Sequence, residues 1–226
     1  MKIKPIIIAI DGFAGCGKST LAKSLANELG FTFLDTGAMY RALSLYFIEK
    51  KIAPNHITLI ENELDNIRIN FEYNLLGKRI TLLNGLNVED KIRSLEVSNQ
   101  VTSFSSICSV RKKLIEQQRL IGINKGIVLD GRDIGTVVFP SAECKFFITA
   151  SIEVRAKRRF EEYARKNPSI KEADIIANLH QRDFDETTRV ESPLIKAENV
   201  HEIDTSLLTK KEALQIALDI VLRDFN

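Results

Sequence analysis

The chain has 226 residues, of which 44% are hydrophobic and 27% charged, and its formal net charge is only +2. This length suits one globular domain with room for a small insert. The charge balance gives no support for a nucleic-acid coat or a membrane-surface protein, and no apolar run approaches the roughly 20 residues that span a bilayer. The apolar run near the start is too short for a signal peptide, so we expect a cytoplasmic protein.

Three widely spaced cysteines support the same expectation. Cys16, Cys108 and Cys144 are odd in number and far apart. They have neither the spacing of a metal site nor that of a disulfide framework, which suits a reducing compartment.

The first elements predict strands that alternate with helices. Residues 5–10 form a continuous isoleucine-rich run, which is typical of a strand buried on both faces of a parallel sheet. A helix is expected over residues 18–29, with Gly30 as its stop, and a short strand over residues 31–34.

Residues 67–90 break this rhythm. The segment IRINFE alternates with period two, and Asn84-Gly85 is a strong type I′ hairpin signal. With a turn over residues 74–77, this predicts three antiparallel strands inserted into the parallel fold. Residues 92–121 return to a helical pattern.

The second half of the chain resumes the alternation. Strands are expected over residues 126–130, 144–150 and 199–205. Residues 151–190 are charged and mostly helical, and Arg155, Arg158 and Arg159 share one helix face there. Thr209 and Glu212 form a capping-box pattern that opens a last helix.

The segment GFAGCGKS (residues 12–19) matches the phosphate-loop pattern G-x-x-x-x-G-K-[ST] in full. Its glycines let backbone N–H groups turn toward phosphate oxygens, and the helix that follows directs its positive dipole end at the same place. Lys18 would reach the β- and γ-phosphates, and the Ser19 hydroxyl would ligate Mg²⁺. The bound phosphate is therefore expected to be that of a nucleoside triphosphate.

The acceptor is a separate question. A GTPase would need Asn-Lys-x-Asp, but Asn124-Lys125 is followed by Gly126 and Ile127. Transfer between two phosphates requires charge neutralisation, for which arginine is well suited. The chain has five arginines in positions that we interpret as turns or element ends: Arg41, Arg111, Arg132, Arg182 and Arg189.

Four segments in this order resemble bacterial cytidylate kinases, a family of nucleoside monophosphate kinases. They are IDGFAGCGKST, FLDTGAMYRA, LDGRDIGTVVFP and RDFDETTRVESPL, and the similarity spans residues 6 to about 194. The resemblance implies a P-loop three-layer α/β/α domain with a central parallel sheet, an inserted antiparallel β subdomain and a short lid. Within a single domain of residues 1–226, we expect a core (1–35, 112–150 and 195–226), a monophosphate-binding insert (about 36–111) and a lid (about 151–194).

The resemblance also implies site residues. ATP would be bound by Gly12, Phe13, Ala14, Gly15, Cys16, Gly17, Lys18, Ser19 and Thr20. Asp130 stands where Mg²⁺ is supported. Arg155 and Arg159 could meet ATP when the lid closes.

On the acceptor side, the resemblance implies that CMP contacts Thr36, Arg41, Thr102, Arg111 and Asp133. Arg132 would reach phosphate, and Arg182 and Arg189 would clamp the two phosphates; with Lys18, these are the expected catalytic residues. The family has aspartate on the sugar hydroxyls where this chain has Glu186, so either Glu186 or the adjacent Asp185 could serve.

The expected reaction moves the γ-phosphoryl group of ATP onto CMP or dCMP, in pyrimidine nucleotide metabolism. The acceptor's own phosphate oxygen is the nucleophile, so no strong general base is needed. Two alternatives stay open: a kinase of another small acceptor such as UMP, AMP or shikimate, and a non-catalytic P-loop regulatory protein. We expect a monomer with no nucleic-acid or membrane partner.

Overall fold

The apolar run at the start of the chain forms β1 (Ile7–Gly12), in which every residue is buried. The structure is a computed structural model that describes residues 3–75, 79–164 and 171–225. The chain divides into two compact units. We call residues 1–35 and 121–226 the core unit, and residues 36–120 the inserted unit.

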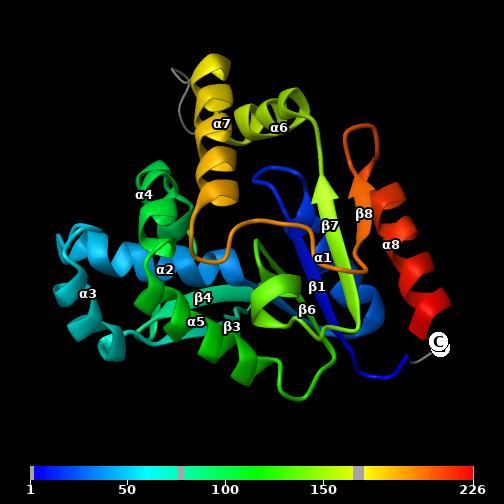
Figure 1. Ribbon diagram of the computed structural model, residues 1–226, viewed down its shortest axis with the longest axis horizontal. Coiled ribbons are helices and arrows are strands. Elements are labelled where there is room, and N and C mark those ends of the chain that lie inside the picture. Colours follow the sequence, from blue (N-terminus) through cyan, green and yellow to red (C-terminus); the bar gives the residue numbers. More distant parts are fainter. Residues whose placement is uncertain (1–2, 76–78, 165–170, 226) are drawn as a thin grey trace. The chain divides into compact units, whose positions relative to one another are not determined.

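The core unit contains a five-stranded sheet in which β1 is the middle strand (Figure 1). Each pairing in this sheet is parallel. The strand order is β2 (Thr32–Asp35), β6 (Ile127–Gly131), β1, β7 (Cys144–Thr149) and β8 (His201–Asp204). The predicted parallel α/β fold is therefore confirmed.

Two helices of the core unit, α1 (Lys18–Leu29) and α8 (Lys210–Phe225), pack against each other and share one hydrophobic cluster with the sheet. Gly30 ends α1 with a positive φ of 68° and donates its N–H to the Ala26 carbonyl oxygen. The predicted capping box opens α8, because Thr209 and Glu212 exchange hydrogen bonds. Both helix ends thus follow from local sequence.

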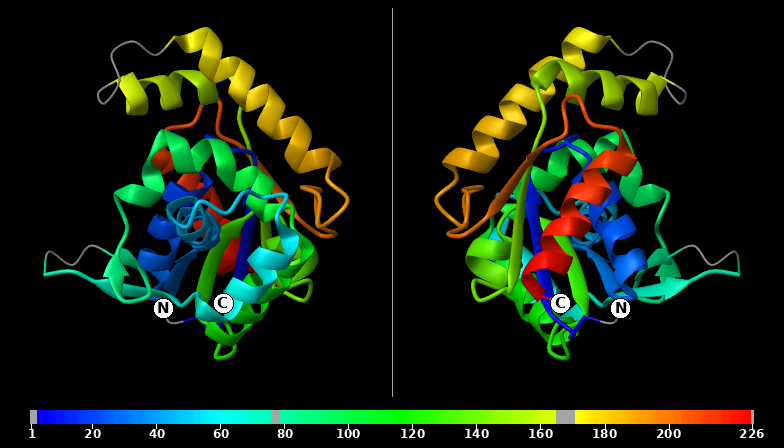
Figure 2. Two further views of the ribbon diagram at one scale, coloured as in Figure 1. Left: turned by 90° about the vertical axis from the view of Figure 1, so that its left-hand side faces the viewer. Right: turned by 90° about the vertical axis from the view of Figure 1, so that its right-hand side faces the viewer.

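The charged segment after β7 forms two helices, α6 (Ile152–Ala164) and α7 (Glu172–Thr188). They pack side by side beyond the carboxyl ends of the strands (Figure 2). A cluster of Ile175 and Leu179 from α7 with Ala156 from α6 and Ala14 from the phosphate loop holds this pair in place.

The inserted unit begins with α2 (Thr36–Glu49), directly after β2. The stacked rings of Phe47 and Phe104, 5.4 Å apart, join α2 to α4 (Leu95–Ser105). Its remaining elements are α3 (Ile57–Glu63), a 3₁₀ turn (Leu64–Asn66), β3 (Ile69–Tyr73), β4 (Arg79–Leu83), β5 (Leu86–Asn87), a 3₁₀ turn (Lys91–Arg93), α4 (Leu95–Ser105) and α5 (Cys108–Ile121).

The predicted antiparallel sheet is confirmed, with the order β3-β4-β5. Asn84 and Gly85 join β4 to β5 and have positive φ angles of 49° and 83°, as a type I′ turn requires. Part of the turn expected over residues 74–77 lies outside the described residues.

The interpretation that all five arginines lie in turns or at element ends is wrong for two of them. Arg41 lies within α2 and Arg182 within α7. No glycine or proline interrupts α7, and the spacing of Ile175 and Leu179 keeps its apolar face on the neighbouring helix.

Among the described residues, no helix is both long and apolar enough to cross a lipid bilayer.

Candidate active site

The phosphate loop, residues 12–20, joins β1 to the first turn of α1. Gly12 and Gly17 have positive φ angles of 151° and 89°, a conformation that residues with a Cβ rarely adopt. A Cβ on Gly12 would lie 2.1 Å from the carbonyl oxygen of Ile148, so only glycine fits there. Gly17 is the N-cap of α1 and offers no side-chain cap. The first N–H groups of α1 therefore suit an anionic ligand such as phosphate.

Lys18 is folded into the loop rather than extended into water. Only 7% of its surface is exposed, and Nζ donates a hydrogen bond to the carbonyl oxygen of Phe13 at 2.9 Å. Burial, together with the nearby positive charge of Arg132, lowers the pKa of Lys18 below its usual range. A bound phosphate would oppose this shift, because a nearby negative charge stabilises the ammonium group.

Ser19 and Asp130 bring two oxygen ligands together beside the loop. The Ser19 hydroxyl donates to Oδ2 of Asp130 at 2.5 Å, and Asp130 is buried near the end of β6. Hydroxyl and carboxylate oxygens suit Mg²⁺, so these residues fit that ion. No group of three histidine, cysteine, aspartate or glutamate side chains within the described part of the chain could hold a metal ion. An ion here would therefore complete its shell with substrate oxygens and water.

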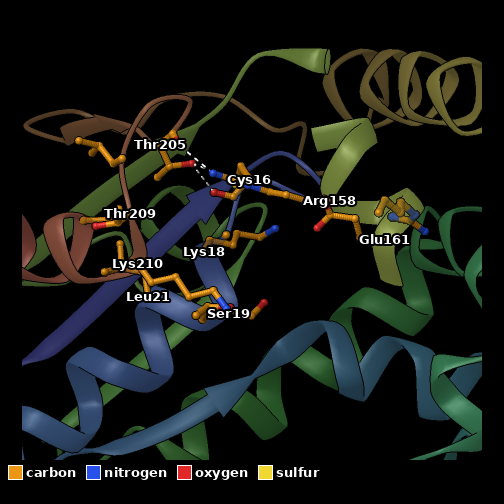
Figure 3. Close-up of a pocket in the computed structure, with 15 residues that line it drawn as sticks. Cys16, Lys18, Ser19, Leu21, Arg158, Glu161, Thr205, Thr209 and Lys210 are labelled. Carbon is orange, nitrogen blue, oxygen red and sulfur yellow. Dashed lines mark hydrogen bonds between the residues drawn. The ribbon is translucent and has the colours of Figure 1, made fainter. Parts of the chain in front are cut away.

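An open pocket with a volume of about 690 Å³ adjoins the phosphate loop within the core unit (Figure 3). Its wall combines loop backbone, the start of α1, one side of α6 and the segment between β8 and α8. The lining residues are Gly15, Cys16, Gly17, Lys18, Ser19, Thr20, Leu21, Arg158, Arg159, Glu161, Thr205, Leu208, Thr209, Lys210 and Ala213. This volume is that of a typical small-ligand site.

Arg158 and Thr205 close one side of this pocket, and the sequence did not identify either as a site residue. The Arg158 guanidinium donates to Oγ1 of Thr205 at 3.1 Å and to its carbonyl oxygen at 2.7 Å. Thr205 in turn donates to the Cys16 carbonyl oxygen at 2.8 Å (Figure 3). Thr205 directly follows β8, and the position of a polar residue just past a strand end was the available signal.

Arg155 and Arg159, both expected near ATP, lie in different surroundings. Arg159 lines the pocket. Arg155 is buried, pairs with Asp183 at 2.7 Å and donates to the Ala150 carbonyl oxygen at 3.0 Å. Its guanidinium also lies 5.2 Å from the ring centre of Phe13 in the phosphate loop. Arg155 thus connects α6 to α7 and to the loop through protein groups.

A second charged cluster in the core unit consists of Arg132, Arg182 and Glu186. The carboxylate of Glu186 accepts from Nε of Arg132 at 2.5 Å and from Nε of Arg182 at 2.8 Å. Burial disfavours the charge on Glu186, but the two guanidinium groups outweigh it and hold its pKa far below its usual range. The positive charge of Arg132 also lowers the pKa of Lys18, so this cluster interacts electrostatically with the phosphate loop.

Two further predicted residues of the core unit have separate contacts. Arg189 follows the last turn of α7 and donates from Nε to the Ser192 carbonyl oxygen at 2.8 Å. Asp133 is buried next to Arg132.

Four predicted acceptor residues belong to the inserted unit. Thr36 is buried at the start of α2, and Thr102 lies in α4. Arg111 is also buried, donates to the Ser105 carbonyl oxygen at 3.1 Å, and lies 5.3 Å from the ring centre of Tyr40. Arg41 lies one residue beyond Tyr40 in the same helix. Arg111 therefore lies next to α2, the helix that also carries Arg41.

The phosphate loop on the middle strand of a parallel sheet, with buried arginines and an adjoining pocket, places the protein among the P-loop kinases. The chain belongs, more narrowly, to the cytidylate kinase family, whose model matches residues 8–223. It is 48% identical to the cytidylate kinase of Flavobacterium psychrophilum, over 97% of this chain and 99% of that one. It is also 48% identical to the cytidylate kinase of Bacteroides fragilis, over 93% of each chain.

Solved structures agree on the fold. A shikimate kinase from Bacteroides thetaiotaomicron has a TM-score of 0.50 and 12% identity, over 97% of this chain and 99% of that one. An uncharacterised protein from Eubacterium ventriosum has a TM-score of 0.52 and 12% identity, over 96% of this chain and 98% of that one. At such identities the likeness concerns the fold alone.

Proposed function

We propose that this protein transfers the γ-phosphoryl group of ATP to CMP and dCMP, giving ADP and the nucleoside diphosphate. The observation that carries the proposal is that Arg132 and Arg182, whose side chains are only 16% exposed, meet on the carboxylate of Glu186, while the buried Lys18 of the phosphate loop feels the charges of both Arg132 and Glu186. Cations concentrated beside a phosphate loop are what transfer between two anionic nucleotides requires. The high identity to cytidylate kinases directs the choice of acceptor toward CMP.

The donor side of the mechanism uses the loop and the pocket. Loop N–H groups and Lys18 hold the β- and γ-phosphates of ATP, and the nucleoside enters the pocket lined by Arg158, Arg159 and Thr205. Mg²⁺, when bound, neutralises phosphate charge next to Ser19 and Asp130. Ser19 and Asp130 contribute by holding their own hydroxyl and carboxylate oxygens beside the triphosphate.

The acceptor side uses arginine in place of a general base. The phosphate oxygen of CMP is already ionised near neutral pH, so catalysis consists of positioning and of charge stabilisation in the transition state. Arg132, Arg182 and Arg189 bind the phosphate groups. The remaining acceptor contacts are Thr36, Arg41, Thr102 and Arg111 from the inserted unit and Asp133 from the core unit, with the sugar near Glu186.

We further propose that the inserted unit and the α6–α7 pair close over the two nucleotides, excluding water from the moving phosphoryl group. We expect a monomer that acts in the cytoplasm, where its nucleotide substrates are found.

A coupled assay of ADP release tests this function across CMP, dCMP, UMP, AMP and shikimate. We expect release with CMP and dCMP to exceed that with UMP or AMP at least about tenfold. Release that is no faster with any acceptor than with ATP alone would favour a non-catalytic P-loop protein, and a preference for AMP or shikimate would identify another kinase. Lys18→Ala removes the positive charge that contacts the β- and γ-phosphates and should abolish turnover. Lys23→Ala, on the exposed side of α1, should leave turnover unchanged.

A further inference from the structure

Asp11 is a buried carboxylate that the proposed reaction does not use. It is the residue of β1 directly before the phosphate loop, and only 4% of its surface is exposed. Oδ1 accepts a hydrogen bond from the backbone N–H of Ile134 at 2.8 Å, and Oδ2 accepts one from that of Gly135 at 2.8 Å. Both oxygens of Asp11 are therefore bound to one loop on the neighbouring strand.

That loop carries Arg132 and Asp133. It leaves β6 at Gly131, which pairs with Asp11 in the register of the sheet. The π-helical turn Ile134–Val138 follows at once. The chain is thus tied to Asp11 on both sides of Arg132 and Asp133: by strand pairing before them and by two side-chain hydrogen bonds after them.

The surroundings of Asp11 disfavour the ionised form of its side chain. Burial, and to a lesser extent the charge of Asp133, raise the pKa of Asp11 to about 7, although the two N–H groups and Arg132 oppose the shift. Lys145 also packs near Gly135, with its Cδ 3.3 Å from where a Cβ on that glycine would lie. A carboxylate kept in an unfavourable place while it fixes a loop suggests a role in geometry rather than in stability.

We propose that Asp11 is a positioning residue that fixes Arg132 and Asp133 relative to the phosphate loop. The proposal rests on the proposed function, in which Arg132 binds phosphate. Because Asp11 precedes Gly12 directly, one residue sets both where the loop for the donor phosphates begins and where the arginine on the neighbouring strand lies. Displacement of a catalytic group by about 1 Å is enough to slow a transfer reaction about 100-fold.

The test compares Asp11→Asn with Glu143→Gln. An asparagine can accept from only one of the two N–H groups, and its own NH₂ faces the other. The control makes the same carboxylate-to-amide change at the opposite end of the same strand, where Glu143 accepts from the Ile7 N–H at 2.9 Å and pairs with Lys125. We expect Asp11→Asn to lower kcat about 10- to 100-fold, with KM for ATP and the Kd for a fluorescent ATP analogue within about threefold of wild type. We expect Glu143→Gln to keep kcat within about twofold.

Amide hydrogen exchange gives a readout that does not depend on activity. The amides of Ile134 and Gly135 should exchange faster in Asp11→Asn and at the wild-type rate in Glu143→Gln. Asp11→Ser is a second variant, because its shorter side chain places no carboxylate oxygen near the N–H groups of Ile134 and Gly135. It should reproduce the loss of kcat even if Asp11→Asn does not fold.

Three results would overturn the proposal. One is wild-type kcat in Asp11→Asn or in Asp11→Ser, and another is unchanged exchange in a folded Asp11→Asn. The third is a parallel loss of kcat, nucleotide binding and thermal stability in Asp11→Asn and Glu143→Gln, which would indicate a general structural role. Wild-type protein without kinase activity would instead contradict the proposed function itself, which keeps the two failures distinct.

Discussion

The side chains of Arg132 and Glu186 meet across 54 positions of sequence, with Nε of the arginine donating to Oε2 of the glutamate at 2.5 Å. Arg182 makes the equivalent contact with the other carboxylate oxygen, also through Nε. Phosphate binding through the terminal nitrogens of the two arginines would therefore leave both contacts to Glu186 in place. Glu186 joins α7 to the loop after β6 and holds two guanidinium groups that would otherwise repel each other.

Glu186→Gln should impair both stability and catalysis. The neutral amide leaves two largely buried arginines, each 16% exposed, without their counter-charge, which costs about 3 kcal/mol in buried pairs. We expect kcat/KM for CMP to fall about 10- to 100-fold. Asp185→Asn is the matched control, because the side chain of Asp185 is partly exposed and accepts from Gln181 at 2.8 Å. Steady-state kinetics and urea unfolding measure both effects, and wild-type behaviour of Glu186→Gln would contradict this role of the cluster.

The same contacts predict weak discrimination between ribose and deoxyribose. Both oxygens of Glu186 already accept from arginine, and the side chain is one methylene longer than the aspartate of the resembling family. We therefore expect the kcat/KM values for CMP and dCMP to agree within about fivefold. A preference for CMP of about 100-fold or more would show that a carboxylate reads the 2′-hydroxyl.

Arg189 should matter more for turnover than for binding. Its Nε contact with the Ser192 carbonyl oxygen keeps it at the end of α7, the helix that also carries Arg182. A group that grips the moving phosphoryl group binds the transition state better than the substrate, so Arg189→Ala should lower kcat about 100-fold with KM changed severalfold at most. Arg223→Ala is the control for loss of one positive charge, because the Arg223 side chain on α8 is 66% exposed. Near-normal kcat in Arg189→Ala would remove it from the catalytic set.

The pH dependence of stability should reveal the buried charge of Asp11. Burial raises its pKa from an ordinary value of 3.8 to about 7, so between these values the folded state binds more protons than the unfolded state. The contribution of Asp11 to stability therefore falls as pH rises from about 4 to 7. Glu186 acts in the opposite sense, because its depressed pKa makes its contribution present above its ordinary range and lost only in stronger acid.

Urea unfolding of wild type and Asp11→Asn across this pH window isolates the effect, since all other titratable groups are the same in both proteins. The difference in unfolding free energy, wild type minus variant, should decrease by a few kcal/mol between pH 4 and 7. A difference that stays constant with pH would mean that Asp11 is not shifted upward.

Local patterns were enough to predict much of the fold. The apolar run of β1, the Asn84-Gly85 turn and the Thr209–Glu212 capping box all depend on residues close in sequence, and all three occur as predicted. Such signals reflect backbone preferences and side-chain spacing that no distant contact needs to supply.

Contacts between distant segments could not be predicted in this way. Asp11 meets its loop 123 positions further on, and Arg158 meets Thr205 47 positions further on. The position of Arg182 within a helix, rather than in a turn, also depends on the apolar packing of α7 against α6. The many polar residues around Arg182 do not reveal this packing. The resemblance to a known family named candidate residues, but it gave no indication that Glu186 binds two arginines.

The central claim is that the protein holds two phosphate-bearing nucleotides end to end, one on the phosphate loop and one on the arginines. Binding of a single molecule that joins adenosine and cytidine through five phosphates tests this directly by calorimetry. We predict one site per chain and an affinity at least about 100-fold above that for ATP or CMP alone, because the linked halves bind as one ligand. Lys18→Ala and Arg182→Ala should each remove most of this gain. An affinity no higher than that for ATP, unchanged by Arg182→Ala, would contradict the account.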